Sequence, residues 1–353
     1  MINKSVLLIA PQYFGYDVLI AKFMRDMGVD VDLLPDRPLN SNAGKAVMRL
    51  NRNLAMPFAD RYFKDKISNF GRKSYDAILV IQGEGVSPML LSWIRSVYPT
   101  TPLTWYLWDS FENKPALHEN LPYFDAVFSF DHKDSKDYGM ALQPLFFSPT
   151  WAQIVHAERK FDLCFIGTGH EDRFPLVRSL KHAHQDKCFF SFLFLPSPML
   201  YAWRRLSDRN LRGSTAGDFS FGKMTQAEVQ NIVAQSEVVL DVQHPAQRGL
   251  TMRTVETMGA RKKLITTNPS VRQYDFYNEN NILVIDRKNP VIPESFFQAE
   301  YSPLDPSVVE KYTVLGFLRA LLGLGFFNEK SIAIQSDILR RESKISRHAY
   351  ATS

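Results

Sequence analysis

The chain opens with two apolar runs separated by a segment of helical spacing, which predicts two strands joined by a helix. Residues 5–11 and 29–35 are the apolar runs, and residues 16–28 place apolar side chains at helical intervals before Gly28. A strand, loop, helix, strand order is the usual start of a parallel doubly wound sheet. The first loop lacks the G-x-G-x-x-G spacing, so the sequence does not support a dinucleotide site there.

The same alternation continues along the chain in two series. The first series predicts further strands at residues 75–83, 102–109, 124–131 and 141–147, and the second predicts strands at residues 161–167, 187–196, 237–242, 262–268 and 281–286. The two series meet near residues 147–160. This pattern predicts an α/β fold of two Rossmann-like doubly wound parallel-sheet domains that face one another across a cleft.

The domain boundaries follow from where the two series begin and end. We expect an N-terminal domain at 1–148, a C-terminal domain at 149–304, a helix at 305–328 that crosses back, and a polar tail at 329–353. Several strands of the first domain end in an acidic residue, among them Glu84, Asp109 and Asp131. Repeated polar strand ends on one sheet edge predict a lined cleft.

Residues 237–268 form the most informative stretch. EVVLDV reads as a buried strand, HPAQRG as a loop, LTMRTVETMGA as a helix and KKLITTN as the next strand. In open α/β sheets ligands bind beyond the carboxyl ends of the strands, and the free N–H groups at a helix start attract phosphate. Here that start is Gly249, Leu250 and Thr251, with His244 and Arg248 in the loop before it.

The helix of this stretch shows two faces. Met252, Val255 and Met258 share one face and are expected to pack on the sheet. Arg253 and Glu256 are three residues apart on another face, which points at whatever lies above the strand ends. They either contact a ligand or pair with each other. Gly259 suits the end of the helix.

Composition supports a globular protein of two domains. The chain has 353 residues, 45% of them apolar and 22% charged, which is more than one core usually fills. Cys164 and Cys188 lie in apolar runs and are expected to be buried free thiols, as in a reducing cytoplasm. No apolar run approaches the roughly 20 residues that span a bilayer.

The net charge of +5 is concentrated in one segment. Residues 45–73 hold eight lysines or arginines and two aspartates, a net of +6, with apolar side chains interleaved. Such a segment suits contact with anionic lipid headgroups or a phosphorylated acceptor, and it equally suits a solvated helix face. Nucleic acid is not an expected partner, because the sequence contains no recognisable nucleic-acid module.

Three stretches carry a resemblance to a known family. IQGEGVSP, WYLWDSFENKP with FDAVFSFDHKD, and DVQHPAQRGLTMRTVETMGARKKLITTN resemble the GT-B glycosyltransferases, in particular CgeB-like and related bacterial glycan-assembly enzymes. The resemblance covers nearly the whole chain. It implies that the C-terminal domain binds a nucleotide sugar and the N-terminal domain an acceptor.

The resemblance also implies roles for single residues. Arg253 and Glu256 would lie near the donor, with Glu256 on the nucleotide ribose, and Gly167 and Thr168 would approach the donor from the first strand of the C-terminal domain. The E-x7-E pair of the large retaining group is absent, since Leu264 stands eight places after Glu256. In this respect the chain departs from that group.

Sugar transfer from a nucleotide sugar requires that the leaving diphosphate be neutralised and, where configuration inverts, that a base take the acceptor proton. No metal-ligand cluster is evident, so no metal or other cofactor is expected. The helix start and Arg173, Arg248 or Arg253 would supply the positive charge. Arg173 could instead pair with Glu171.

The base is expected in the N-terminal domain. Asp109 is the first candidate, because it follows the strand WYLW, and Glu84, between two glycines, is the second. Asp109 could alternatively cap the following segment through the amides of Ser110 and Phe111.

The leading hypothesis is a cytoplasmic glycosyltransferase that moves a sugar from a nucleotide-sugar donor to a glycan or lipid-linked glycan during assembly of a bacterial surface polysaccharide. Residues 45–73 would touch the inner face of the cell membrane. A nucleotide-sugar 2-epimerase and a non-catalytic two-lobed sugar or nucleotide sensor are the alternatives.

Overall fold

The chain divides into two compact units, each built on its own sheet. A computed structural model describes residues 4–13, 15–38, 52–154, 157–245 and 247–327. The first unit contains residues 1–144 and the chain from Val314 on, and the second contains Leu145–Thr313. Along the chain the divisions fall after Pro144 and after Thr313. In place of the single helix expected at 305–328, the described residues form two helices, Pro306–Lys311 and Val314–Leu322.

The first unit contains a six-stranded parallel sheet with the strand order β2-β1-β3-β4-β5-β6. Its strands are β1 (Ser5–Ala10), β2 (Asp30–Pro35), β3 (Ala77–Ile81), β4 (Leu103–Leu107), β5 (Ala126–Ser129) and β6 (Ala141–Leu142). Its helices are α1 (Tyr16–Asp26), α3 (Arg52–Asn69), α4 (Pro88–Val97), α5 (His132–Tyr138) and α13 (Val314–Leu322), with a 3₁₀ segment η1 (Pro115–Tyr123). The order reverses between β1 and β3, which is the doubly wound topology that the sequence predicts.

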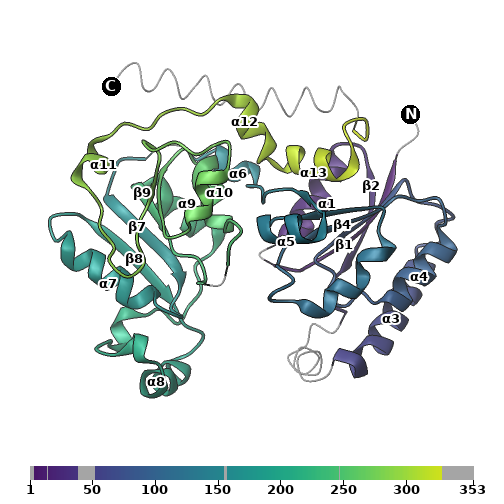
Figure 1. Cartoon of the computed structure of the whole chain (residues 1–353), viewed down its shortest axis with the longest axis horizontal. Coiled ribbons are helices and arrows are strands. Elements are labelled where there is room, and N and C mark those ends of the chain that lie inside the picture. The colour runs from purple at the N-terminus through teal and green to yellow at the C-terminus, as the bar shows by residue number, and fades with distance from the viewer. Residues whose placement is uncertain (1–3, 14, 39–51, 155–156, 246, 328–353) are drawn as a thin grey trace. The chain divides into compact units, whose positions relative to one another are not determined.

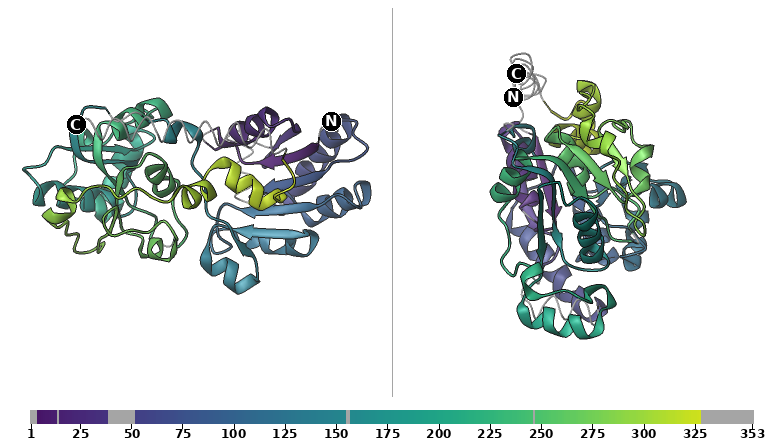
Figure 2. Two further views of the ribbon diagram at one scale, coloured as in Figure 1. Left: turned by 90° about the horizontal axis from the view of Figure 1, so that it is seen from above. Right: turned by 90° about the vertical axis from the view of Figure 1, so that its left-hand side faces the viewer.

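The second unit contains a five-stranded parallel sheet with the order β11-β10-β9-β7-β8. Its strands are β7 (Phe161–Thr168), β8 (Phe189–Phe194), β9 (Ser236–Asp241), β10 (Lys263–Thr266) and β11 (Ile282–Val284). Its helices are α6 (Pro149–Ala152), α7 (Arg173–Ala183), α8 (Pro198–Ser207), α9 (Gln226–Ala234), α10 (Met252–Gly259), α11 (Glu294–Gln298) and α12 (Pro306–Lys311). Figure 1 and Figure 2 show strands flanked by helices in this unit as in the first.

Central strands of both sheets are buried on both faces, as the apolar runs predict. Every residue of β3 and β4 is buried. The fully buried Trp105 of β4 stacks on Phe124, with 4.9 Å between ring centroids, and its indole N–H donates to the carbonyl of Gln82 at 2.9 Å. Helices on both sides of a parallel sheet remove both faces from water, so the strands carry apolar side chains in both directions.

Helix α10 lies where the sequence places it, but its end differs from the expectation. Val255 and Met258 are buried against the unit, as predicted. Gly259 is still helical, and the left-handed residue that follows the helix is Arg261, with φ +54°. A Cβ on Gly259 would stand 2.6 Å from the ring of Phe147. Close packing, and not helix termination, therefore requires the glycine.

The side chains of two consecutive lysines at the start of β10 bind to the ends of two different helices. Lys262 Nζ donates to the carbonyl of Ala234 at 2.9 Å, at the end of α9. Lys263 Nζ donates to the carbonyls of Phe296 and, at 2.6 Å, Ala299 around the end of α11. Side chains of neighbouring strand residues point to opposite faces, so each lysine reaches the helix on its own side and binds carbonyls that the helix end leaves unpaired.

The cysteines and the basic segment differ in part from the sequence-based picture. Both cysteines are free, as expected, but only Cys164 is buried, because Cys188 precedes β8 and is exposed.

Residues 45–51 of the basic segment 45–73 lie outside the described residues. In the described part, Arg72 pairs with Asp30 at 2.5 Å, while Arg61 on α3 is 84% exposed. Within the described residues, no helix is long and apolar enough to cross a membrane.

Candidate functional site

The carboxyl end of β9 is joined to the start of α10 by a buried carboxylate. Asp241, the last residue of β9, accepts hydrogen bonds from the hydroxyls of Thr251 at 2.6 Å and Thr254 at 2.9 Å. Burial raises the pKa of Asp241, and the two hydroxyl donors work against that shift. Thr251 is also the N-cap of α10, since its hydroxyl accepts from the amide of Thr254. The sequence-based site missed Asp241, although it is the acidic residue near the end of the apolar run EVVLDV.

The loop between β9 and α10 is held by amide side chains. Asn268 is buried, and its Nδ2 donates to the carbonyl of Gly249 at 3.0 Å and to that of Arg248 at 3.3 Å. Gln247 Nε2 donates to the carbonyl of Leu250 at 3.2 Å. Gly249 and Leu250 are buried by this arrangement, whereas the side chain of Arg248 is exposed. Side-chain amides thus hold the backbone of residues 248–250, where the side chain of Arg248 is exposed.

Arg253 and Glu256 lie together on α10, as their spacing predicts. Nη1 of Arg253 is 3.0 Å from Oε2 of Glu256, and the two side chains are 19% and 10% exposed. The guanidinium of Arg253 lies 5.5 Å from the ring centroid of Trp151 in α6. Of the two possibilities that the sequence left open, a ligand contact or an ion pair, the structure shows the ion pair. Both side chains are held in place by their neighbours.

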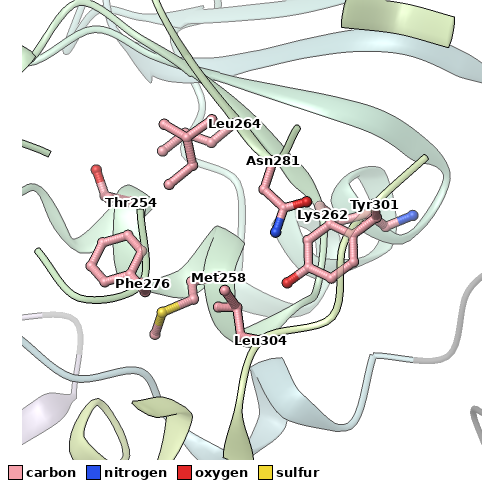
Figure 3. A pocket seen from close by; sticks show the side chains of 9 residues that line it. Thr254, Met258, Lys262, Leu264, Phe276, Asn281, Tyr301 and Leu304 are labelled. Carbon is pink, nitrogen blue, oxygen red and sulfur yellow. The ribbon is translucent and has the colours of Figure 1, made fainter. Parts of the chain in front are cut away.

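The other face of α10 borders a small cavity (Figure 3). Thr254 and Met258 contribute to its wall from α10. The remaining lining residues are Lys262, Leu264, Phe276, Asn281, Ile282, Tyr301 and Leu304. Its volume of about 10 Å³ admits at most a water molecule, so a nucleotide does not fit there. Burial lowers the pKa of Lys262 beside this cavity to about 8.

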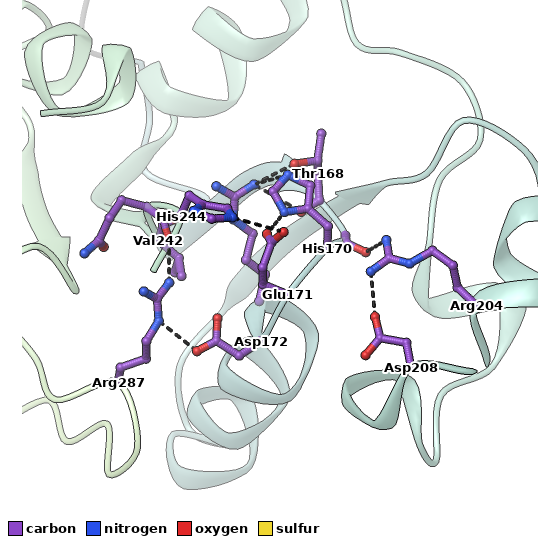
Figure 4. A network of polar contacts seen from close by, with 12 residues as sticks. Thr168, His170, Glu171, Asp172, Arg204, Asp208, Val242, His244 and Arg287 are labelled. Atoms are coloured by element: carbon purple, nitrogen blue, oxygen red, sulfur yellow. Dashed lines mark hydrogen bonds and ion pairs between the residues drawn. The ribbon is translucent and has the colours of Figure 1, made fainter. Parts of the chain in front are cut away.

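At the carboxyl end of β7, Arg173 connects two strand ends (Figure 4). Its Nη1 donates to the hydroxyl of Thr168 at 2.6 Å, and its Nε donates to the carbonyl of Val242, just after β9, at 2.9 Å. Arg173 therefore joins β7 to β9 and does not pair with Glu171, the partner that the sequence suggested for it. Gly167 lies at the β7 end beside Thr168, where a Cβ would meet the ring of Phe165 at 2.9 Å.

Two histidines meet one glutamate above Arg173. Glu171 has a left-handed backbone with φ +50°, and its carboxylate contacts His170 and lies 3.6 Å from His244 Nε2. Burial, with the positive charges of Arg173 and Arg204, lowers the pKa of His170 to about 4. His170 is therefore neutral near pH 7. Among these residues His244 came from the sequence as a ligand candidate, and His170 did not.

Arg287 is a second cation at this edge that sequence reasoning missed. Its Nε lies 2.7 Å from the carboxylate of Asp172, and it also donates to the carbonyl of Gln243. It follows β11 closely, and a charged residue just past a late strand end is the signal that could have found it. Arg287 is 20% exposed and lies beside the loop that contains Arg248, but Asp172 offsets its positive charge.

In the first unit, Asp109 caps the turn after β4. Its carboxylate accepts from the amide of Ser110 at 3.0 Å and from Nδ2 of Asn113 at 2.8 Å. Its own amide donates to Oε1 of Gln82 at 2.8 Å. The expected cap through Phe111 is wrong, because that amide donates to Asp134 at 2.8 Å.

Glu84, the second candidate base, is held by two cations. Its Oε1 lies 2.7 Å from Nη2 of Arg37 and 2.9 Å from Nζ of Lys114. Burial alone would raise the pKa of Glu84, but these two cations lower it below its usual value. Beside it, burial and the charge of Glu84 raise the pKa of the buried Asp36 to about 7.

Within the ranges that the structure describes, no group of three or more His, Cys, Asp or Glu side chains is arranged to hold a metal ion. Asp30 and Asp32 in β2 are two residues apart, a spacing that can contribute carboxylates to a metal site. Here both carboxylates are paired with Arg72.

Similarity to solved structures covers both units. The chain is similar to sucrose-phosphate synthase from Thermosynechococcus elongatus, with 12% identity and a TM-score of 0.54 over 99% of this chain and 100% of that chain. It is similar to Anabaena HepE in complex with UDP-glucose, with 11% identity and a TM-score of 0.52 over 94% and 99%. AviGT4, a glycosyltransferase involved in avilamycin A biosynthesis, shares 12% identity with a TM-score of 0.52 over 90% and 98%.

At such identities the likeness establishes the fold, which is the two-unit GT-B glycosyltransferase fold predicted from the sequence. No protein-family model and no curated protein matches the chain. The narrower resemblance to CgeB-like enzymes remains a prediction.

Proposed function

We propose that the protein is a glycosyltransferase that takes its sugar from a nucleotide-sugar donor. The observation that carries the proposal is the fold shared over nearly the whole chain with HepE, whose structure contains UDP-glucose. Fold alone does not assign activity. The β9–α10 region supports the proposal, because it offers a fixed loop, a helix start and an exposed arginine at the carboxyl edge of a parallel sheet, where such folds bind ligands.

For the donor, we propose that the first amides of α10 and Arg248 meet the diphosphate. Arg248 is exposed, whereas Arg173 is occupied between two strand ends and Arg253 by Trp151 and Glu256. Arg287, beside the same loop, is paired with Asp172 and is therefore not counted as a diphosphate ligand. Glu256 would accept from the ribose hydroxyls, with Arg253 fixing its orientation.

For the transfer step, we propose Asp109 as the base. The acceptor hydroxyl oxygen forms a bond to the anomeric carbon, the bond from that carbon to the diphosphate oxygen breaks, and the hydroxyl proton passes to the Asp109 carboxylate. Glu84 fits this role less well, because Arg37 and Lys114 stabilise its ionised form and so weaken it as a proton acceptor. Glu84 instead holds the two cations in place.

We further propose that the acceptor is a glycan or lipid-linked glycan of a bacterial surface polysaccharide, that the first unit binds it, and that the reaction needs no metal. The basic segment 45–73 would contact anionic lipid at the inner face of the cell membrane; its charge is the support for this step.

A two-stage experiment tests the proposal. Thermal unfolding with UDP, GDP, CMP and dTDP sugars identifies the donor, because a ligand that binds the native state raises the midpoint. The protein is then incubated with the radiolabelled donor, with and without a glycan acceptor and with and without EDTA. Labelled glycan and free nucleotide support transfer. Isomerised nucleotide sugar without an acceptor identifies an epimerase, and binding with no nucleotide release under either condition identifies a sensor.

A further inference from the structure

Helix α8 (Pro198–Ser207) of the second unit carries an exposed apolar stripe. Met199, Trp203 and Leu206 are 81%, 65% and 91% exposed. Their positions follow the i, i+4, i+7 spacing that places side chains on one helix face, and the exposed Ala202 completes the stripe. Three large apolar side chains in one exposed stripe exceed the scattered single residues that are normal on a protein surface.

The stripe faces away from its unit because the opposite side of α8 is anchored. Tyr201 is buried, and its hydroxyl donates to the carbonyl of Ser214 at 3.1 Å. Its ring lies 5.2 Å from that of Phe219, between centroids. At 100° per residue, Tyr201 is on the helix side opposite Met199 and Leu206. Figure 1 and the right-hand view of Figure 2 place α8 at one extremity of the second unit.

Positive charge is concentrated in α8 and in the residues that follow it. Residues 198–213 contain four arginines, Arg204, Arg205, Arg209 and Arg212, and a single acid, Asp208. Asp208 is paired with Arg204 at 2.6 Å, and the other three arginines are exposed. An apolar face with tryptophan, bordered by arginines, is the composition of a helix that lies in a membrane interface, where headgroups carry negative charge and acyl chains accept apolar side chains.

The helix is also joined to the carboxyl edge of the second sheet. Nη1 of Arg204 donates to the carbonyl of Gly169 at 3.1 Å, in the loop that follows β7 (Figure 4). A contact made by α8 would therefore fix the position of the loop that includes His170 and Glu171.

From this combination we propose that α8 is a docking surface for an anionic lipid bilayer. Met199, Trp203 and Leu206 enter the headgroup and acyl boundary, and Arg205, Arg209 and Arg212 bind the lipid phosphates. This surface is separate in sequence from residues 45–73, and its existence does not depend on the proposed transferase activity.

Co-sedimentation of the full chain with vesicles tests the proposal, without any nucleotide sugar present. Binding is expected to vesicles of phosphatidylcholine mixed with phosphatidylglycerol and to be weak with phosphatidylcholine alone. The variant M199S/W203S/L206S is expected to lose about tenfold or more in partition coefficient, since each apolar side chain contributes to insertion. The variant R205Q/R209Q/R212Q is expected to lose a similar factor on anionic vesicles, and added salt is expected to weaken wild-type binding.

Two matched controls locate the surface. Met89 in α4 is 63% exposed and Val291 in the second unit is 59% exposed, so M89S and V291S remove exposed apolar side chains outside both α8 and residues 45–73. Both are expected to bind as wild type. Each variant is compared with wild type by thermal unfolding, so that lost binding is assigned only to folded protein.

A depth measurement gives an independent readout. Brominated acyl chains are expected to quench the tryptophan emission of wild-type protein on anionic vesicles. W203F keeps an apolar ring, so it is expected to bind while losing most of that quenching. The proposal is overturned if wild-type protein does not bind anionic vesicles, or if M199S/W203S/L206S binds as tightly as wild type. It is also overturned if sedimentation velocity shows a dimer that the triple-serine variant dissociates, because the stripe would then bind a second copy.

Discussion

Nη1 of Arg253 lies 3.0 Å from Oε2 of the buried Glu256 on α10. The ring of Trp151 lies beneath the guanidinium, so the arginine is held from two sides and in turn orients the glutamate. A carboxylate that is oriented before its ligand arrives binds with less loss of side-chain entropy. The structure shows the ion pair, and substitution tests the proposed second role of Glu256 as a hydrogen-bond acceptor for the donor.

Replacing Glu256 by alanine is expected to weaken nucleotide-sugar binding by roughly ten- to a hundredfold, the usual effect of losing hydrogen bonds to a charged group. Isothermal titration with the donor found by thermal screening measures this change. Glu279→Ala, an exposed carboxylate of the same unit, is the control and is expected to bind normally. Unchanged donor affinity in Glu256→Ala would show that the carboxylate only pairs with Arg253.

Replacing Asp109 by asparagine is expected to lower kcat by about a hundredfold or more, because the amide cannot take the acceptor proton. The donor KM is expected to change little, since Asp109 lies in the first unit. Asn113→Ala removes one hydrogen bond of the turn that Asp109 caps and is expected to leave most of the activity. Equal activity losses in Asp109→Asn and Asn113→Ala would mean that Asp109 acts only as a cap.

His170 makes stability depend on acid pH. Its pKa is about 4 in the folded protein and about 6.5 in an unfolded chain. Between these values the unfolded chain binds a proton that the folded protein does not, so the free energy of unfolding falls as pH decreases from about 6.5 to about 4.

Thermal unfolding across this window tests the His170 prediction. His170→Gln is expected to reduce the pH slope, whereas His182→Gln, at an exposed site on α7, is expected to keep it. The same slope in wild type and His170→Gln would contradict the assignment.

Asp36 is expected to change the free energy of unfolding with pH in the direction opposite to His170. Its pKa of about 7 in the folded protein lies above the ordinary aspartate pKa of 3.8, so between these values the folded protein holds a proton that the unfolded chain has released. Stability from this group is present at low pH and is lost as pH rises towards about 7, by about 1.4 kcal/mol for each unit of pKa shift. Asp36→Asn should flatten this part of the stability profile in chemical denaturation. A profile that rises equally in both proteins from pH 4 to 7 would contradict it.

Gly259→Ala is expected to destabilise the second unit, although alanine normally favours a helix by about 1 kcal/mol. The added Cβ would stand 2.6 Å from the Phe147 ring, and such overpacking typically costs about 1–3 kcal/mol. Gly222→Ala is the control, because a Cβ there meets nothing within 4 Å. Thermal unfolding measures both. In combination with Phe147→Leu, the loss should be less than additive; a strictly additive double variant would show that the two residues do not collide.

Several features of the fold follow from local sequence. The apolar runs that become β3, β9 and β10 are visible without a structure, because strands of a parallel sheet are buried on both faces and contain few polar residues. The pairing of Arg253 with Glu256 was also predictable, because residues three apart on a helix are neighbours by geometry alone.

Other features depend on partners far apart in the chain, which local sequence cannot reveal. Arg173 resembles a phosphate ligand in sequence, yet its Nε donates to the carbonyl of Val242, 69 residues away. Arg287 contacts Asp172 and Gln243 from beyond β11, and nothing near it in sequence indicates that partner set.

The sequence by itself determined the alternating order of strands and helices in the two sheets and the helix face that carries Arg253 and Glu256. Only the tertiary structure decided which charged groups near α10 are already paired with other side chains. It also decided that the Phe147 ring leaves no room for a side chain at Gly259, and that Lys262 donates a hydrogen bond to the end of α9. The physical reason is the distance along the chain over which each effect acts. Periodicity and capping act within a few residues, whereas burial, close packing and ion pairing depend on segments that folding brings together.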